Sequence, residues 1–524
     1  MNKTTMFSKV ILFCSLLFVT GAILLYFGFF DKGSDEKPSK APEVTAAIPA
    51  PQPPGAQGSR LFSDNTIKIG LDEWHGWKPV VDANRGVGSG QAGSIYKDLG
   101  LDVEILVIND GEEALQALIR GDVVAIGKSV NEWPYILAQL QEAGVSGKMV
   151  LVTDKSTGGD GIVTTADISG IEGLAGHTIV VAENSAAHAM TEWLLKTSSL
   201  SDAQIPEIRK NMIFANTAEE AYEIFSKGEA DVTVLWEPYL TMANNLPGAR
   251  TIFSTKYANN LMVDGIVFRD DYLNQHPEAV EKFVEGTLRA RNEYAKELRY
   301  IREFEDYDGL SDKEIFAMDE LVAFPGFANN RELFSGMIQS LYNEMASVWN
   351  NLGKTTVANG SQTGFADEFL VNLAAKFSDD VTSVPALAEN TDFNNPVIQE
   401  NTNTSVLLKQ TLTINFEPNV AIIREDSYDD LAAFAQTAKI LNGAIIQVEG
   451  NIANTGTGDT SVGRQLSEQR AKAVCDYLVG LGISEERLIA VGNGISKPVP
   501  GFDPRSREGM EKNRRTDIFF LMLE

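Results

Sequence analysis

The stretch GHTIVVAENSAAHAMTEWLL, residues 176–195, decides the fold of the larger part of this chain. It opens with β-branched residues at 178–181, which are typical of a buried parallel strand. Asn184 and Ser185 come next, and both residue types cap helices, so a helix is expected to follow directly. A strand that leads into a helix in this way is the repeating unit of an open α/β sheet.

The start of this helix is a candidate binding position. Its first backbone N–H groups lack partners within the helix, and the helix dipole adds partial positive charge there. Ligands of open α/β sheets bind beyond the carboxyl ends of the strands, where Asn184 and Ser185 are expected. These residues therefore either cap the helix only or also contact a negatively charged ligand group.

Strand and helix patterns alternate from Thr66 onward. The predicted strands are 67–71, 102–108, 123–126, 149–152, 178–181, 212–214, 232–235, 251–253 and 265–268. The predicted helices are 111–120, 133–143, 188–195 and 217–226. This alternation predicts parallel sheets covered by helices. The lengths indicate two lobes, between which the chain crosses near 153–161 and 254–264.

Tryptophans and polar residues gather directly after the predicted strands. Aromatic walls with a few convergent polar groups are the usual form of a small-ligand site, and Trp133 is a further aromatic neighbour. The candidate ligand-binding residues are Asp72, Trp74, Trp77, Ser129, Asn131, Asn184, Ser185, Trp236, Glu237 and Asp264.

The charges near these positions favour a ligand with a cationic group. Lys78 and Lys128 supply positive charge nearby, whereas several of the candidates are carboxylates. Tryptophan faces and carboxylates attract amines through cation–π contacts and charge pairing. Because the helix start at Asn184 suits a carboxylate or a sulfonate, a zwitterion would satisfy both ends.

Five motifs in this region, in this order, carry a resemblance to a known family. They are GLDEWHGWKP at 70–79, DGEEALQALIRGDVVAIGKSVNEW at 110–133, DISGIEGLAGHTIVVAENSAAH at 167–188, NTAEEAYEIFSKGEADVTVLWEPYL at 216–240, and YNEMASVWNNLGK at 342–354 followed by FADEFLVNLAAKF at 365–377. Residues 65–379 resemble the periplasmic substrate-binding proteins of nitrate, taurine and aliphatic-sulfonate ABC transporters. The resemblance implies an α/β bilobed clamshell of the type II periplasmic-binding-protein class, which binds a small solute for ABC-type uptake or sensing.

Catalysis is not expected, although thiamine-pyrimidine synthases share this scaffold. Those enzymes carry a cysteine-rich motif, and residues 65–379 contain no cysteine. The GxSxG, HExxH and Walker A patterns are also missing from this sequence. Asp72 and Glu73 are adjacent on a strand, so their side chains point to opposite faces and cannot act together. The sequence predicts a binding protein without a cofactor or a metal.

The N-terminus carries a candidate membrane anchor. Residues 10–30 are 21 residues without a charge, which is long enough for a helix that crosses a bilayer. Lys3 and Lys9 precede this run, so the positive-inside rule leaves residues 1–9 in the cytoplasm. A cleaved signal peptide is the alternative, but the residues that follow do not form a small-residue cleavage site. The Pro-rich residues 31–64 are typical of an extended linker.

A second α/β unit, residues 405–524, follows a polar linker at 380–404. Its predicted strands are 412–416, 444–448, 487–491 and 517–522, and its predicted helices are 427–441 and 466–481. Ser427 and Asp430 predict a capping box at the first of these helices. The motifs VEGNIANTG, LSEQRAKAVCDYLVGLGISEERLIAVGNG and NRRTDIFF resemble the OmpA-like peptidoglycan-binding domain.

This second resemblance implies contacts with the cell wall through Arg470, Asn513 and Arg514. In the family, an Asp and the Arg hold the ammonium and carboxylate groups of a diaminopimelate side chain. The position of that Asp is Ala453 here. Because removing the partner of a desolvated charge costs on the order of a few kcal/mol, weak wall binding is expected. A structural or protein-docking role is the alternative.

Composition limits the classes of partner. A net charge of −28 argues against nucleic-acid binding, which needs a basic face. The two cysteines, Cys14 and Cys475, do not predict a disulfide within a domain. We expect a solute-binding protein of the Gram-negative envelope, held in the inner membrane by a single span, with its bulk in the periplasm and an ABC permease or a sensor as partner. The alternative hypothesis is an envelope structural protein whose bilobed domain no longer binds a solute.

Membrane fractionation tests the anchor. The full-length protein should remain in the inner-membrane pellet after a high-salt wash, because salt screens surface charges but does not extract a spanning apolar helix. A mature soluble form that begins after residue 30 would contradict the prediction.

Overall fold

The computed structural model describes residues 66–294, 300–304, 307, 310–356, 364–377, 404–455 and 461–523. The expected membrane span at 10–30 and the linker at 31–64 lie outside these residues, as does nearly all of the linker at 380–404. Within the described part of the chain, no helix combines the length and the apolar character that crossing a bilayer requires.

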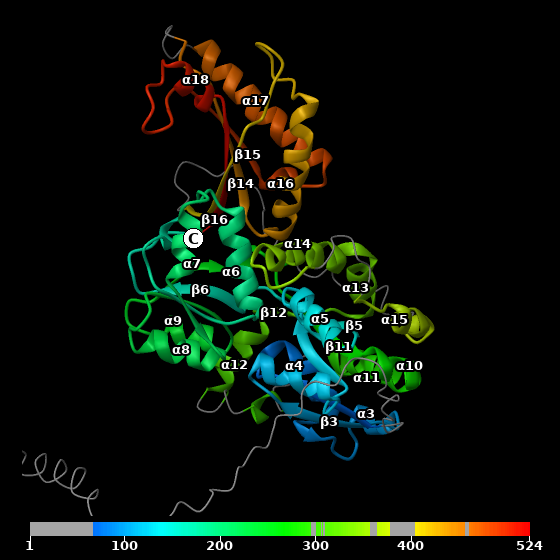
Figure 1. Ribbon diagram of the computed structural model, residues 1–524. Coiled ribbons are helices and arrows are strands. Elements are labelled where there is room, and N and C mark those ends of the chain that lie inside the picture. Colours follow the sequence, from blue (N-terminus) through cyan, green and yellow to red (C-terminus); the bar gives the residue numbers. More distant parts are fainter. Residues whose placement is uncertain are drawn as a thin grey trace, which may run out of the picture. The chain divides into compact units, whose positions relative to one another are not determined.

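The first lobe is built on a seven-stranded sheet in the order β12-β5-β11-β4-β1-β3-β2. Its strands are β1 (Thr66–Leu71), β2 (Gly88–Ser89), β3 (Asp102–Val107), β4 (Ala125–Ser129), β5 (Gly147–Ser156), β11 (Val263–Arg269) and β12 (Val322–Ala323). Helices α4 (Gly111–Arg120), α5 (Trp133–Glu142) and α11 (Pro277–Tyr294) pack around it (Figure 1). The centre, β4-β1-β3, is parallel as expected, whereas β11 is antiparallel to β4 and β5. The direction reverses at β11 because the chain returns there from the other lobe.

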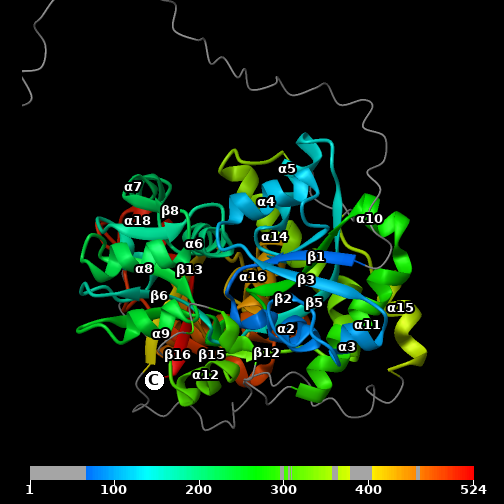
Figure 2. The same cartoon turned by 90° about the horizontal axis from the view of Figure 1, so that it is seen from below.

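The second lobe holds a five-stranded sheet in the order β10-β6-β9-β7-β8. Its strands are β6 (Asp160–Thr164), β7 (Ile179–Ala182), β8 (Met212–Ala215), β9 (Val232–Trp236) and β10 (Arg250–Ser254). Helices α6 (Ala186–Thr197), α8 (Ala218–Ser226) and α9 (Tyr239–Asn244) belong to this lobe, which lies beside the first in Figure 2.

The chain crosses between the lobes after β5 and again after β10. Both crossings lie where the sequence indicates them. Strand β6 is a feature that the sequence did not reveal, because its residues fall at the end of the first predicted crossing.

Helix α14 (Ile338–Asn351) packs against α5 of the first lobe and α6 of the second. Its Trp349 is fully buried, and the indole Nε1 donates a hydrogen bond to the carbonyl oxygen of Asn131 at 2.8 Å. The same ring meets the edge of His188 on α6, with 5.5 Å between the ring centroids. Because one indole contacts both lobes, α14 links them independently of the two crossings.

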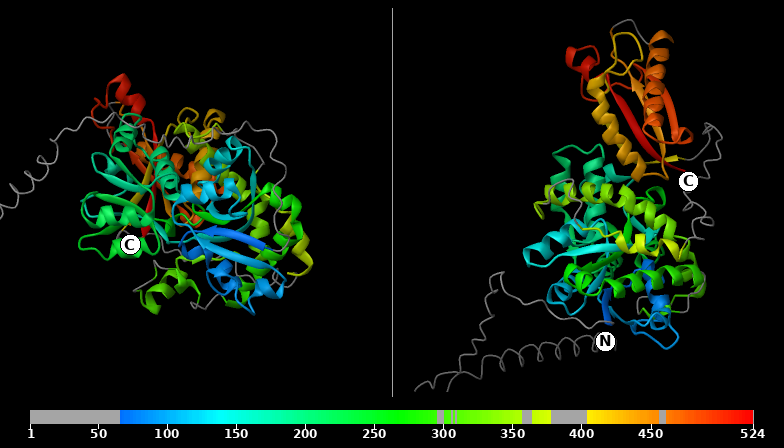
Figure 3. Two further views of the ribbon diagram at one scale, coloured as in Figure 1. Left: turned by 60° about the horizontal axis from the view of Figure 1, so that its bottom comes forward. Right: turned by 90° about the vertical axis from the view of Figure 1, so that its right-hand side faces the viewer.

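The C-terminal domain has a four-stranded sheet in the order β13-β16-β14-β15. Its strands are β13 (Thr404–Leu412), β14 (Ile445–Asn451), β15 (Leu488–Gly494) and β16 (Thr516–Leu523). Helices α16 (Tyr428–Ile440) and α17 (Ser461–Gly480) lie beside the sheet in Figure 3, and α18 (Arg507–Asn513) precedes the last strand.

Two predictions for this domain are wrong. The first strand occupies 404–412 instead of 412–416, because the earlier residues pair with β16 over their whole length. The predicted capping box is absent from α16, since the Oγ of Ser427 accepts a hydrogen bond from the backbone N–H of Asn415 at 2.9 Å. That contact ties the loop before the helix to its first turn.

Candidate functional site

A cavity lies between the two lobes, at the carboxyl ends of β1, β4, β7 and β9. Asp72 and Ser129 line it from the first lobe, and Asn184 and Trp236 line it from the second. The volume that the centre of a water molecule can occupy in this cavity is about 80 Å³. One buried water needs about 10–15 Å³ by this measure, so the space suits a small ligand.

Two tryptophans of the cavity are held in place by carboxyl groups. The indole Nε1 of Trp77 donates to Oδ1 of Asp72 at 2.5 Å. The indole Nε1 of Trp74 donates to Oδ2 of Asp154 at 3.1 Å. Each indole is therefore positioned through its one polar group, which leaves the aromatic surface for apolar or cationic contacts.

Buried carboxyl groups dominate the charge of the cavity. Asp154 of β5 and Asp264 of β11 are cross-strand partners, and both side chains are buried. Burial raises the pKa of Asp154 to about 7, and burial together with Asp154 raises the pKa of Asp264 well above its usual value. Burial also raises the pKa of Asp160 to about 7. Asp160 lies opposite Trp236 in the register of β6 and β9, so the acidic group extends to the aromatic wall.

Among the described residues that line the cavity, Lys128 is the one cation. Its Nζ lies 3.5 Å from Oε2 of Glu132. Burial raises the pKa values of Asp72 and Glu132, and Lys128 opposes the rise at both. One ammonium group therefore faces several carboxyls, whose raised pKa values a bound cation would lower.

The start of α6 forms the opposite side of the cavity. The Oγ of Ser185 accepts from the N–H of His188 at 3.2 Å, so this residue does cap the helix. Asn184 has a left-handed backbone with φ 56°, and its Nδ2 donates to the hydroxyl of Tyr135 in the first lobe at 3.3 Å. Lys354, which follows α14, donates from Nζ to Oδ1 of Asn184 at 2.9 Å. A cation thus stands beside the helix start.

The structure brings most of the sequence-predicted site residues to this cavity. Those that line it are Asp72, Trp74, Trp77, Ser129, Asn184, Ser185, Trp236 and Asp264. Asn109, Glu132 and Lys128 line it too. Asp160 and Lys354 were missed, because one begins an unrecognised strand and the other approaches from a distant part of the chain.

Three other predicted positions do not line the cavity. Asn131 is fully buried and contacts α14 through Trp349 and Met345. Glu237 accepts hydrogen bonds from the N–H and the hydroxyl of Thr241, within α9. Trp133 is fully buried and donates to the carbonyl oxygen of Gly364 at 2.9 Å. A position after a strand does not reveal whether the side chain turns to the cleft or to a neighbouring helix.

The predicted wall-binding residues of the C-terminal domain lie in different environments. Arg470 donates from Nε to the carbonyl oxygen of Val420 at 3.2 Å, and its guanidinium carbon lies 4.8 Å from the ring centroid of Phe416. Burial lowers the pKa of Arg470, and the charge of Arg514 lowers it further. Two guanidinium groups therefore share one region of the surface, which favours an anionic ligand group.

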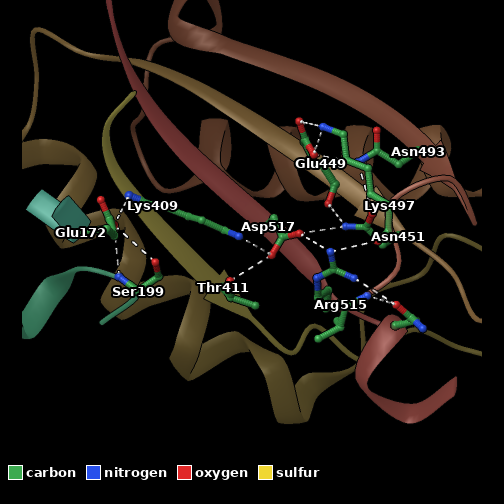
Figure 4. A network of polar contacts seen from close by, with 12 residues as sticks. Glu172, Ser199, Lys409, Thr411, Glu449, Asn451, Asn493, Lys497, Arg515 and Asp517 are labelled. Carbon is green, nitrogen blue, oxygen red and sulfur yellow. Dashed lines mark hydrogen bonds and ion pairs between the residues drawn. The ribbon is translucent and has the colours of Figure 1, made fainter. Parts of the chain in front are cut away.

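Asn513 does not join them, because it is buried and its Oδ1 accepts from the N–H of Val499 at 2.8 Å. Figure 4 shows Asp517 bonded to Thr411, Asn451 and Arg515. This network fixes the end of β14, from which the loop with Ala453 departs. At the start of this loop the backbone N–H of Ile452 donates to the carbonyl oxygen of Gly494 at 3.0 Å, and Ala453 presents a methyl group where the resemblance implies a carboxylate.

Two family models match the chain. The model "NMT1/THI5 like" matches residues 90–297, and the model "OmpA family" matches residues 415–514. Outer membrane porin F of Pseudomonas aeruginosa is 34% identical over 112 residues, which are 21% of this chain and 31% of that protein. Peptidoglycan-binding protein ArfA of Mycobacterium bovis is 35% identical over 91 residues, which are 17% and 27%. The chain spans about a third of the length of these curated relatives.

Solved structures are similar to part of this chain. The alkanesulfonate-binding protein SsuA from Xanthomonas axonopodis pv. citri bound to MOPS is 15% identical, with a TM-score of 0.43 over 58% of this chain and 96% of that one. The periplasmic nitrate-binding protein NrtA from Synechocystis PCC 6803 is 12% identical, with a TM-score of 0.44 over 62% and 90%. By the two family models, the chain joins an NMT1/THI5-like domain, residues 90–297, to a C-terminal OmpA-family domain, residues 415–514.

Proposed function

We propose that this protein binds a small solute with a cationic amine group in the cavity between its lobes and delivers it to an ABC permease or a sensor. The cluster of buried carboxyl groups beside Trp74, Trp77 and Trp236 supports the proposal. An ammonium group would favour the ionised forms of Asp160 and of the Asp154–Asp264 pair, whose pKa values burial raises. Aromatic faces would add cation–π attraction where water is excluded.

A zwitterion fits the arrangement better than a simple amine. Its acidic end would lie at the start of α6, where backbone N–H groups and the dipole favour an anion. Lys354 is bonded there to Glu183 and Asn184 and would supply a second positive charge. The cavity would then pair each end of the ligand with the opposite charge.

The cavity suits binding without catalysis. Its hydroxyl groups donate to acceptors that are poor bases, since the Oγ of Ser129 donates to the Oδ1 of Asn131 and the Oγ of Ser185 donates to the carbonyl oxygen of Ala182. Activation of a serine nucleophile requires a base such as histidine at hydrogen-bond distance. In the same proposal, residues 10–30 anchor the protein in the inner membrane and the C-terminal domain contacts peptidoglycan.

A thermal-shift screen of the full-length protein tests the solute class. Glycine betaine, choline, putrescine, amino acids, taurine and nitrate are suitable probes. A ligand at a hundredfold excess over its Kd should stabilise the protein by about 2.7 kcal/mol. Trp236→Ala should weaken binding at least about tenfold, because a buried aromatic contact is typically a hot spot. The exposed Phe316 offers a matched control as Phe316→Ala. Binding of nitrate alone would refute the cationic solute, and binding of no probe would favour the structural alternative.

The stability of the ligand-free protein should depend on pH. The pKa values of Asp154 and Asp160 rise from 3.8 to about 7 on folding, so the folded state binds more protons than the unfolded state in that range. The contribution of these two groups to stability is therefore greatest at acidic pH and falls as pH rises towards 7, by up to about 1.4 kcal/mol per pH unit for each group. Thermal melts from pH 5 to pH 8 should show a falling Tm, with a smaller slope in Asp160→Asn. The exposed Asp202 is the control, as Asp202→Asn. A Tm that rises with pH would contradict the prediction.

Pull-down with purified sacculi tests the C-terminal domain. Retention of the full-length protein should be weak, because Ala453 gives an ammonium group no partner. Ala453→Asp should increase retention, and Arg470→Ala should abolish the remainder. Arg505→Ala, at an exposed position, should leave retention unchanged. Strong binding of the wild type that survives Arg470→Ala would place the wall contact on another surface.

A further inference from the structure

The second crossing between the lobes, which follows β10, is hydrogen-bonded to the C-terminal domain. The backbone N–H of Gly443, just after α16, donates to the carbonyl oxygen of Tyr257 at 3.1 Å. The backbone N–H of Asn259 donates in the other direction, to Oδ1 of Asn442 at 2.9 Å. The crossing is therefore held by the end of α16 at consecutive points.

Asn260 connects this contact to the first crossing. Its Nδ2 donates to the carbonyl oxygen of Lys439 on α16 at 3.0 Å. Its Oδ1 accepts from Nζ of Lys155 at 2.6 Å, and Lys155 stands near the end of β5 where the first crossing begins. One amide thus joins α16 to both segments that connect the lobes.

The two crossings are also bonded to each other. Oγ1 of Thr255 lies 2.8 Å from Oγ of Ser156 and accepts from the N–H of Asp160 at 3.2 Å. The N–H of Ser156 donates to the carbonyl oxygen of Met262 at 3.0 Å. Asp160 and Met262 both line the cavity between the lobes. The hinge is therefore one hydrogen-bonded unit with the cavity on one side and α16 on the other.

The C-terminal domain bonds to the second lobe as well. The N–H of Lys409 donates to Oε1 of Glu172 at 3.1 Å, a contact visible in Figure 4. Nε2 of Gln410 donates to the carbonyl oxygen of Thr197 at 2.7 Å. Through β13, the C-terminal domain therefore contacts the second lobe in addition to the hinge.

We propose that the C-terminal domain and the cavity are coupled through this hinge. Binding of a solute in the cavity alters the contact of the domain with residues 257–260, and that contact in turn alters the affinity of the cavity for the solute. A rearrangement at Asp160 moves the crossing that Thr255 holds, and Asn260 passes the change to α16. Coupling of this kind is reciprocal, so a force on the C-terminal domain alters solute affinity. The role of the cavity rests on the proposed function, whereas the coupling itself can be measured without any solute.

Gly443 provides a specific way to break the contact. A Cβ atom on this residue would lie 2.6 Å from the carbonyl oxygen of Lys256 and 2.9 Å from Cα of Tyr257. Both neighbours belong to the backbone of the crossing, which cannot rotate away as a side chain can. Gly480, at the end of α17 in the same domain, has open space around its position and serves as the matched control.

Hydrogen exchange of the full chain, without solute, tests the coupling. Gly443→Ala and Gly443→Leu should accelerate exchange at residues 255–260 and also at 156–160, to which the hinge bonds given above connect the domain. We expect at least about a fivefold change, the lower end of typical coupling. Gly480→Ala should change neither segment, and unchanged exchange in β14 confirms that the domain is folded.

Asp160→Asn makes the reciprocal measurement from the cavity side, and it should change exchange at residues 439–443. Acceleration at 255–260 alone would show that the domain contacts the hinge without coupling to the cavity, and would overturn the proposal. Unchanged exchange at both segments in Gly443→Leu would overturn it too. The leucine side chain would then have disturbed no contact on which the hinge depends.

Discussion

The pairing of the buried carboxyl groups of Asp154 and Asp264 is the interaction on which the centre of this protein depends. The two residues face each other across β5 and β11, the strands by which the chain leaves the first lobe and returns to it. Burial disfavours the ionised form of both groups, and the charge of Asp154 disfavours it further at Asp264, so the pKa values of both carboxyls are raised. A cation bound beside these groups would favour their ionised forms. The same residues therefore pair two strands of the first sheet and, in the proposed function, favour a cationic solute.

The sequence revealed the architecture more fully than it revealed the side-chain directions. Strand ends could be located from apolar runs, and Asp72, Ser129 and Asn184 line the cavity because strand ends converge there. Asn131 and Glu237 occur in the same kind of sequence position, yet one packs under α14 and the other bonds within α9. The direction of a side chain depends on which helix covers the strand end, and this is decided by segments far away in the chain.

Residues that the sequence could not indicate share one property, which is that their contacts are long-range. Lys354 reaches Glu183 and Asn184 from beyond α14, and no local pattern marks it. The start of β13 was misplaced for a similar reason, because pairing with β16 extends the strand towards a polar linker. Ala453 differs from these residues, because the local sequence was enough to identify it. Comparison with the expected motif showed directly that a carboxylate is missing at this position.

Gly443 also bears on how such a protein can evolve. Domains joined by a polar linker are usually exchanged among proteins with little adjustment, because the linker imposes no shape on either partner. Here a residue without a side chain is required where α16 meets the backbone at Lys256 and Tyr257. The C-terminal domain has thus become fitted to the neighbour it is fused to, and recombination with another solute-binding domain would have to recreate that fit.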